Sequence, residues 1–210
     1  MWDQRYAEEG YAYGERPNDF LVEMLPDLPV GETLCLAEGE GRNAVFLASH
    51  GFQVSAVDQS ETGLAKARDL ADRHGVSLTT TQADLANFDL GSKRWDLIVS
   101  IWAHLPSALR VPLHRQVVEG LRPGGALVLE AYTPGQLQFG TGGPGDVDLL
   151  MTLQELRQEL SGLELRVGRE IEREVQEGKY HNGTSAVVQI LAFKPSSSHL
   201  ERLATRSQEE

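Results

Sequence analysis

The chain has 210 residues and a mass of 23.1 kDa, a size that suits one domain built around one hydrophobic core. Hydrophobic residues make up 40% and charged residues 24%, which is typical of a folded globular protein and excludes a disordered or fibrous chain. The net charge of −12 repels phosphate backbones and anionic lipid headgroups, so we expect neither a nucleic acid nor a membrane as partner.

Cysteine usage and hydrophobic patterning indicate the compartment. Cys35 is the only cysteine, which excludes an intrachain disulfide and favours a reducing environment, and its apolar neighbours predict a core position. No stretch approaches the roughly 18 apolar residues that cross a bilayer, and residues 1–6 lack the apolar segment of a secretory signal. These features predict a cytoplasmic protein.

Strand and helix signals alternate along the first two thirds of the chain. Short apolar runs bounded by Gly, Pro or polar residues predict strands at 33–37, 52–57, 76–82, 95–102 and 126–132. Helical spacing of apolar residues predicts helices at 43–48, 61–74 and 107–121, the last with Ser107 as N-cap and Arg122-Pro-Gly-Gly125 as stop signal. This alternation predicts a parallel sheet with right-handed crossovers.

The last third of the chain has a different pattern. Residues 134–148 contain five glycines and two prolines, which predicts a mobile loop or lid without regular structure. A short helix capped by Thr152 is predicted at 152–160, and strands at 163–175 and 185–193 are joined around 178–183 as a hairpin. We therefore predict an α/β fold with a Rossmann-like, doubly wound, seven-stranded sheet, mostly parallel with an antiparallel C-terminal hairpin.

One domain is expected over 1–195, since no linker or internal repeat divides the chain. It would consist of an N-terminal cap segment (1–32), a cofactor-binding core (33–134), a flexible loop (135–148) and a C-terminal helix and hairpin (149–195). The serine-rich, charged residues 196–210 are predicted to be a disordered tail.

The residues after the predicted strands are mostly glycine and carboxylate. Ligands of open α/β sheets bind beyond the carboxyl ends of the strands. There the chain has Gly39-x-Gly41-x-x-Ala44, a pattern that permits a tight turn and a close ligand, and Asp58, which can accept both hydroxyls of a ribose. The alternatives are an ordinary strand–helix turn at the glycines and a helix cap at Asp58 or Ser60. Together these features favour an adenosine-containing ligand.

Charge in the glycine loop distinguishes between adenosine cofactors. Glu38 and Glu40 would repel the pyrophosphate of a dinucleotide and attract the ammonium and sulfonium of S-adenosylmethionine. Arg42 partly offsets them, and it is expected to point to solvent or to pair with the carboxylate of the cofactor.

A family resemblance rests on several of these segments. Leu34-Cys-Leu-Ala-Glu-Gly-Glu-Gly-Arg-Asn-Ala44 resembles the first motif of class I S-adenosylmethionine-dependent methyltransferases, and Leu121-Arg-Pro-Gly-Gly125 resembles the motif before their fifth strand. Trp2-Asp-x-Arg-Tyr6 and Tyr13-Gly-x-x-Pro-Asn18 are similar to the branch of tellurite-resistance and thiopurine methyltransferase-like proteins. The chain departs from many relatives at Cys35 and Ala37, where they have an acid and a glycine, so more of the binding of the methionine end falls to Glu38.

The resemblance implies site residues. Asp58 corresponds to the ribose acid, and Asp84 to the acid that faces the adenine amino group, with a solvated turn residue as the alternative for Asp84. The implied cofactor-binding set is Tyr13, Glu38, Gly39, Glu40, Gly41, Arg42, Asn43, Asp58, Gln59, Asp84, Leu85 and Ser100. From its position just past the fourth predicted strand, His104 is the candidate catalytic base, with a structural group before Leu105-Pro106 as the alternative, and His181 is expected in the hairpin turn. No spacing of His, Cys and carboxylates indicates a metal site.

The aromatic residues of the first fourteen positions have two interpretations. Trp2, Tyr6, Tyr11 and Tyr13 either belong to a helix packed on the sheet or cover the cofactor with a ring near its sulfonium.

The function that this pattern favours is methyl transfer from S-adenosylmethionine to a small-molecule acceptor. A thiol or a chalcogenide is the candidate acceptor, because its anion is already nucleophilic and can react without a base. The alternatives are an NAD(P)-dependent oxidoreductase and a non-catalytic methyltransferase-like binding module. The sequence leaves the acceptor and the oligomeric state open.

Overall fold

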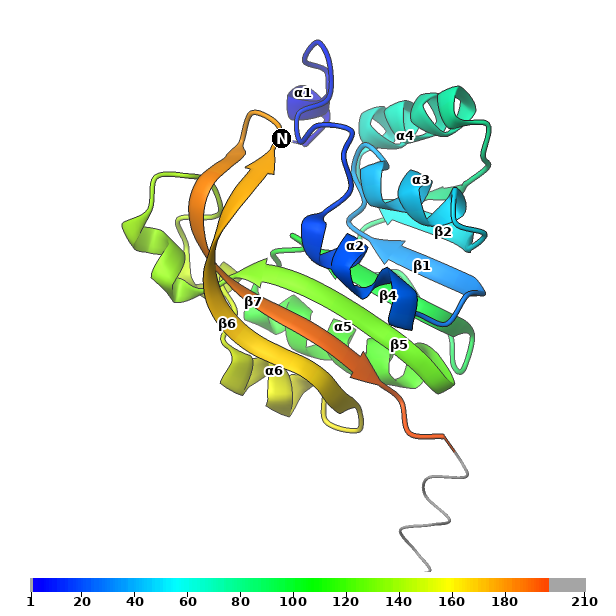
Figure 1. Cartoon of the computed structure of the whole chain (residues 1–210), viewed down its shortest axis with the longest axis vertical. Coiled ribbons are helices and arrows are strands. Elements are labelled where there is room, and N and C mark those ends of the chain that lie inside the picture. Colours follow the sequence, from blue (N-terminus) through cyan, green and yellow to red (C-terminus); the bar gives the residue numbers. More distant parts are fainter. Residues whose placement is uncertain (1, 197–210) are drawn as a thin grey trace, which may run out of the picture.

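A computed structural model describes residues 2–196 and contains a seven-stranded sheet in the order β3-β2-β1-β4-β5-β7-β6 (Figure 1). The first five strands are mutually parallel, β7 is antiparallel to β5, and β6 is antiparallel to β7. The strands are β1 (Glu32–Leu36), β2 (Gln53–Asp58), β3 (Thr79–Gln82), β4 (Trp95–Ile101), β5 (Leu121–Tyr132), β6 (Glu164–Glu177) and β7 (His181–Phe193). The predicted fold class is confirmed.

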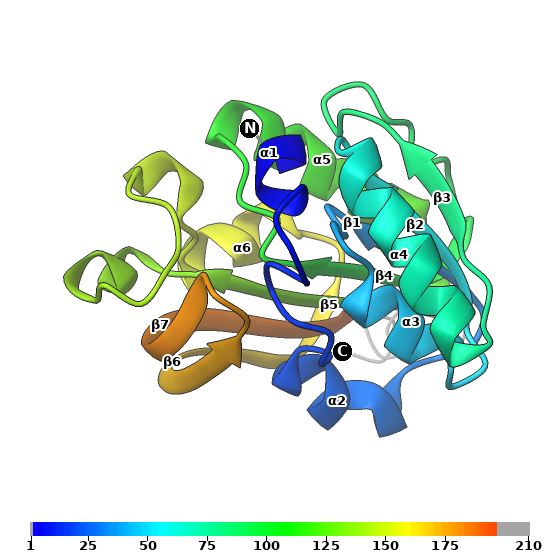
Figure 2. The same cartoon turned by 90° about the horizontal axis from the view of Figure 1, so that it is seen from above.

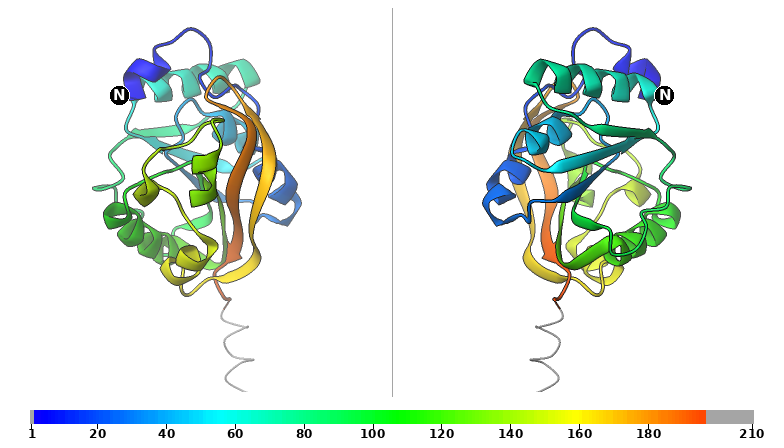
Figure 3. Two further views of the ribbon diagram at one scale, coloured as in Figure 1. Left: turned by 90° about the vertical axis from the view of Figure 1, so that its left-hand side faces the viewer. Right: turned by 90° about the vertical axis from the view of Figure 1, so that its right-hand side faces the viewer.

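Helices cover both faces of the sheet (Figure 3). The helices are α1 (Trp2–Tyr6), α2 (Asp19–Met24), α3 (Arg42–Ala48), α4 (Glu61–His74), α5 (Ser107–Gly120) and α6 (Leu153–Glu159). Along β1, Leu34 and Leu36 pack with residues of α5 and α6, whereas Cys35 packs with residues of α2, α3 and α4. This alternation follows from the period of two in a strand and explains why the strands are apolar on both faces. The core position predicted for Cys35 is confirmed.

Local capping sets the ends of two helices as predicted. The side chain of Ser60 accepts a hydrogen bond from the Gly63 amide at the start of α4, and Gly75 in a left-handed conformation ends it. Thr152 and Glu155 form a reciprocal capping box at the start of α6.

Other boundaries differ from the predictions. Pro106, not Ser107, is the N-cap of α5 and makes no side-chain cap. β5 already begins at Leu121 because Trp95 pairs with that residue across an irregularity in the register. The predicted third strand is shorter, and α2 was not predicted.

The glycine-rich stretch and the hairpin also differ. The predicted absence of regular structure over 134–148 is wrong, since two 3₁₀ helices lie there, η2 (Pro134–Gln138) and η3 (Val147–Leu149). A further one, η1 (Leu25–Asp27), follows α2. The hairpin strands extend to Glu177 and from His181, so the turn is shorter than predicted. Apart from Ser196, the predicted tail lies outside the described residues, and within 2–196 no helix has the length and hydrophobicity to cross a membrane.

Candidate active site

A cavity of about 440 Å³ lies beyond the carboxyl ends of the parallel strands. Its wall combines the segments after β1, β2, β3 and β4 with residues from the N-terminal segment, the glycine-rich stretch and the hairpin tip. Figure 2 shows α1 and the chain that follows it crossing above this end of the sheet, between α4 and the β6–β7 hairpin. The strand-end residues that sequence analysis singled out are therefore gathered in one place, where open α/β sheets bind ligands.

The glycines of the loop after β1 serve packing inside the protein. Gly41 is the N-cap of α3 with φ of 89°, and a Cβ atom on it would lie 2.5 Å from the Cβ of Ala67 in α4. A Cβ on Gly39 would lie 2.5 Å from the hydroxyl oxygen of Tyr6. Gly39, Gly41 and Ser100 are the predicted cofactor-binding residues that do not line the cavity. The two glycines instead bring α4 and α1 close to the loop.

Glu38 is the acidic group of this loop that remains available to a ligand. Its carboxylate accepts hydrogen bonds from the amides of Asn43 and Ala44 at 3.0 and 2.8 Å, in the first turn of α3. Burial nevertheless raises the pKa of Glu38 to about 7, against the opposing effects of these amides and of Arg42. A cation bound beside Glu38 would lower this pKa and favour the ionised carboxylate.

Glu40 and Arg42 have partners within the protein, which corrects part of the electrostatic prediction. Glu40 accepts a hydrogen bond from the Ala12 amide at 2.7 Å and pairs with Lys66 at 3.0 Å. Arg42 pairs with Glu177 at 2.6 Å and is 7% exposed, so it does not point to solvent. Since Lys66 already balances Glu40, the attraction for a ligand cation rests on Glu38.

Asp58 lies at the end of β2 on the cavity wall. Its two carboxylate oxygens accept hydrogen bonds from the amides of Gly39 and Ser60, at 2.9 and 2.8 Å. Burial raises its pKa, an effect that these two hydrogen bonds oppose. Ser60, not Asp58, caps α4. The carboxylate thus joins the glycine loop to the segment after β2 and stays accessible from the cavity.

The residues after β3 form another part of the wall. Asp84 is exposed, and its side chain accepts a hydrogen bond from the Ala86 amide at 2.9 Å. This is the geometry of a solvated turn residue, the alternative role for Asp84. It still lines the cavity together with Leu85 and with Gln59 after β2. The segment after β3 thus places an acidic and an apolar side chain on the cavity wall.

The N-terminal segment covers part of the cavity, and its aromatic residues contact both the protein interior and the cavity. Tyr6 is buried against the glycine loop, while Trp2, Tyr6 and Tyr13 all line the cavity. Asp3 holds α1 to the start of α4 through Ser60. Arg5 donates a hydrogen bond to the Tyr13 hydroxyl at 2.8 Å. Helix α1 packs against α4.

The residues after β4 form an aromatic wall. Trp102 adopts a positive φ of 58°, unusual for a non-glycine residue, and its ring stacks on Tyr132 at 4.4 Å between centroids. His104 accepts a hydrogen bond from the Tyr132 amide through Nε2 at 3.0 Å, and burial lowers its pKa to about 3. The predicted role of His104 as a base is not supported, since the Nε2 atom that would take the proton already accepts a hydrogen bond from the Tyr132 amide.

Sequence analysis did not assign several residues of the cavity wall to the site. Among them are the polar residues Arg5, Tyr180 and His181, and His181 is expected from the sequence only in the hairpin turn. The sequence around the hairpin does not indicate that Tyr180 and His181 reach the cavity, because the order of the strands in the sheet brings the hairpin tip there. Among residues 2–196 no three His, Cys, Asp or Glu side chains are grouped to hold a metal ion.

Comparisons with known proteins add a family similarity. Residues 34–125 match the family model described as "Methyltransferase domain". The uncharacterized methyltransferase YbaJ of Bacillus subtilis is 26% identical over 124 residues, which cover 59% of this chain. The match spans 49% of YbaJ, about half the length of that relative.

Two solved structures share the fold. NodS, an N-methyltransferase from Bradyrhizobium japonicum solved with S-adenosyl-L-homocysteine, has a TM-score of 0.71 at 16% identity, covering 93% of this chain and 97% of its own. TehB from Haemophilus influenzae has a TM-score of 0.71 at 18% identity, covering 84% of this chain and 62% of its own. These likenesses concern the fold.

Proposed function

We propose that the chain, whose residues 34–125 match the methyltransferase family model, transfers the methyl group of S-adenosylmethionine to a small-molecule acceptor. The bound cofactor would supply an electrophilic methyl group on a sulfonium. The protein would then contribute binding, alignment of the two reactants and exclusion of water.

The observation that carries this proposal is the charge and shape of the cavity. Glu38, with a pKa of about 7 in the folded protein, offers a carboxylate to the ammonium of the methionine part. Asp58 offers a carboxylate oxygen to the ribose, and Asp84 with Leu85 suits the adenine. These groups line one cavity in the order of the cofactor's own parts, so the donor set fits the cofactor.

The rest of the wall suits an acceptor with an apolar body. Beyond the cofactor groups the cavity is lined by Trp102, Leu105, Pro144, Leu149 and Tyr180, with the polar side chains of Arg5 and His181 beside them. Such a wall favours an apolar organic body over an inorganic oxyanion. A thiol therefore remains the proposed acceptor, with a chalcogenide as the second candidate from the resemblance.

Two alternatives remain distinguishable. A nicotinamide-dependent oxidoreductase would have to place a pyrophosphate beside Glu38, whose ionised form repels it. A non-catalytic binding module is favoured by Cys35 and Ala37, which replace an acid and a glycine of many relatives.

Calorimetric titration of nucleoside-free protein separates these functions. We expect S-adenosylmethionine and S-adenosylhomocysteine to bind and NADH not to bind. Asp58→Ala should weaken the affinity for S-adenosylhomocysteine about tenfold or more, since a hydrogen bond to a charged group contributes roughly 1.5–3 kcal/mol. Asp89→Ala, a change at an exposed carboxylate outside the cavity, is the matched control. Failure of both adenosyl compounds to bind would refute the proposed cofactor.

The proposed function includes closure over the acceptor. Gly142, Gly143 and Pro144 of the glycine-rich stretch line the cavity opposite the N-terminal segment, so both segments can cover a bound ligand. Limited proteolysis should then be slower with S-adenosylhomocysteine than without it. Equal rates of cleavage in these segments would contradict closure.

A further inference from the structure

The hairpin tip places one polar side chain in the cavity wall without a hydrogen-bond partner. His181 is 7% exposed and lines the cavity, and its Nδ1 atom is buried with no partner in the structure. Its ring packs beside Tyr13 at 4.7 Å and Trp102 at 5.1 Å between centroids. A buried polar atom left unpaired is rare in folded proteins and calls for an explanation.

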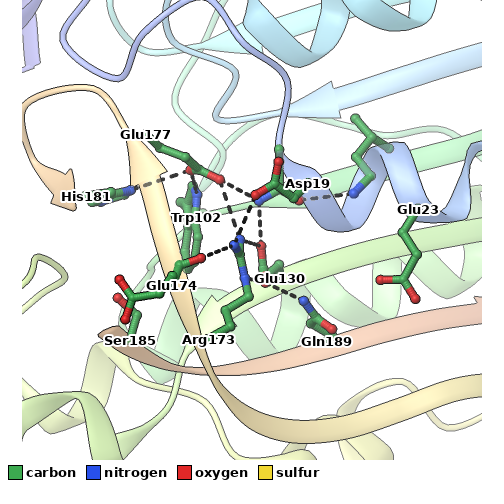
Figure 4. A network of polar contacts seen from close by, with 12 residues as sticks. Asp19, Glu23, Trp102, Glu130, Arg173, Glu174, Glu177, His181, Ser185 and Gln189 are labelled. Carbon is green, nitrogen blue, oxygen red and sulfur yellow. Dashed lines mark hydrogen bonds and ion pairs between the residues drawn. The ribbon is translucent and has the colours of Figure 1, made fainter. Parts of the chain in front are cut away.

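The nearest charged group to this nitrogen is Glu177 at the end of β6. Its Oε2 atom lies 3.9 Å from His181 Nδ1, which is ion-pair distance but too long for a hydrogen bond (Figure 4). Glu177 also accepts hydrogen bonds from Arg42 at 2.6 Å, Trp102 Nε1 at 2.5 Å and Asn18 at 2.8 Å. These contacts hold the carboxylate in one position behind the imidazole.

Glu177 is ionised in this environment. Burial favours the neutral acid, but the positive charge of Arg42 and the hydrogen-bond donors around the carboxylate outweigh burial and hold the pKa of Glu177 well below its usual range. A fixed negative charge behind a neutral imidazole stabilises the imidazolium that forms when the ring takes a proton.

The other candidate bases near the aromatic wall are unsuited. The Nε2 lone pair of His104 is occupied by the Tyr132 amide. Tyr132 does not line the cavity, and burial raises the pKa of its hydroxyl. Glu38 and Asp58 lie where the cofactor binds. His181 is the remaining imidazole on the wall between the aromatic residues and the glycine-rich stretch.

We propose that His181 is the general base that deprotonates a neutral organic thiol bound against the aromatic wall, and that Glu177 is its positioning residue; this rests on the methyl transfer proposed above. An alkyl thiol is mostly protonated at neutral pH, so it enters the cavity as the neutral thiol and must release its proton there, whereas a strongly acidic thiol arrives as the thiolate and needs no base. The base thus determines which acceptors react.

The proposed methyl transfer conserves atoms and electrons. The thiol sulfur forms a bond to the methyl carbon while the bond between that carbon and the sulfonium breaks, and the electron pair of the broken bond stays on the cofactor's sulfur. The thiol proton passes to His181 Nε2, because Nδ1 faces Glu177. The products are a thioether, S-adenosylhomocysteine and an imidazolium that returns its proton to solvent.

The charges around His181 set its pH dependence. Glu177 and the ring itself belong to the hairpin, while Arg42 from α3, Arg5 from α1 and His104 after β4 face it from the other elements. Burial lowers the pKa of His181, and Glu177 opposes this. The ring is therefore neutral at neutral pH, which is the form that a base requires.

The test compares two thiols of different acidity near neutral pH. Thiophenol is largely ionised there, whereas benzyl mercaptan is largely protonated and needs a base. We expect His181→Gln to reduce kcat for benzyl mercaptan about a hundredfold, within the range for general bases, and to change kcat for thiophenol less than about fivefold. His50→Gln, at an exposed histidine, is the matched control.

A second measurement does not depend on activity. The ring resonances of His181 in the complex with S-adenosylhomocysteine, followed by NMR against pH, should titrate below the ordinary histidine pKa and move further down in Glu177→Gln. If the His181 ring does not titrate, or if its pKa is the same in Glu177→Gln, the pairing of His181 with Glu177 is overturned. His181→Asn provides the resonance assignment if the His181→Gln variant folds poorly.

Each outcome decides between the two proposals. Equal losses of kcat on both thiols, or no loss on either, overturn the base role. If the parent protein binds S-adenosylhomocysteine but methylates neither thiol, the thiol acceptor and its base are refuted while the cofactor assignment stands. If S-adenosylhomocysteine does not bind, the proposed function itself fails.

Discussion

The contact between α5 and α6 provides a quantitative prediction about stability. Glu159, at the end of α6, pairs with Arg110 at 2.9 Å and with His114 Nδ1 at 2.6 Å, and all three side chains are less than a tenth exposed. Burial favours the neutral acid, but the hydrogen bonds from His114 and Arg110 and the charge of Arg110 lower the pKa of Glu159 from 4.5 to about 2.

This lowered pKa corresponds to a contribution to the free energy of unfolding. At about 1.4 kcal/mol for each tenfold change in proton affinity, the ionised carboxylate contributes about 3 kcal/mol at neutral pH. Because the folded state binds the proton more weakly than the unfolded state, the contribution is complete above the unfolded pKa of 4.5 and disappears as the pH falls toward about 2. Glu159→Gln should lose it at neutral pH.

Urea unfolding followed by tryptophan fluorescence measures the difference. We expect Glu159→Gln to be less stable than the parent by about 2–3 kcal/mol at neutral pH, and the difference to shrink on acidification. Glu61→Gln is the control, because Glu61 pairs with Arg68 at an exposed site and such pairs contribute less than about 1 kcal/mol. A neutral-pH loss for Glu159→Gln no larger than that of the control, or one unchanged by acid, would refute the reasoning.

Three further predictions concern the site and its support. Since the pKa of Glu38 is about 7, calorimetry should show the affinity for S-adenosylhomocysteine falling as the pH drops through 7. Glu38→Gln should remove this dependence. The same dependence of affinity on pH in the variant would exclude a contact between Glu38 and the ammonium. Gly41→Ala should lower the free energy of unfolding in urea by about 3 kcal/mol, since it adds backbone strain and a Cβ 2.5 Å from that of Ala67. The control Gly75→Ala, at a φ of 67° with open space around it, should lower it only by the strain of about 1 kcal/mol. Equal losses of stability would contradict the packing role of Gly41. Glu130→Ala should cost about 3–5 kcal/mol, because the fully buried carboxylate pairs with Arg173 at 2.8 Å and accepts hydrogen bonds from Asn18 and Gln189, and all three donors would lose this acceptor; a thermal midpoint equal to that of the parent would disprove this.

The sequence by itself determined the elements whose causes are local. The helix over 61–74 has the predicted bounds because its N-cap and its C-terminal glycine lie next to it in the chain. The strands of the parallel sheet followed from apolar runs, and the carboxylates after them reached one cavity because parallel strands end at the same edge.

Only the tertiary structure decided how the charges of the site are paired. Glu40 and Arg42 were assigned from their neighbours in sequence, but their partners lie far along the chain, as for Arg42 and Glu177, which are 135 positions apart. Such contacts depend on β7 lying between β5 and β6, which brings the hairpin tip beside the glycine loop. No local pattern encodes that order, because it results from burying the faces of all strands at once.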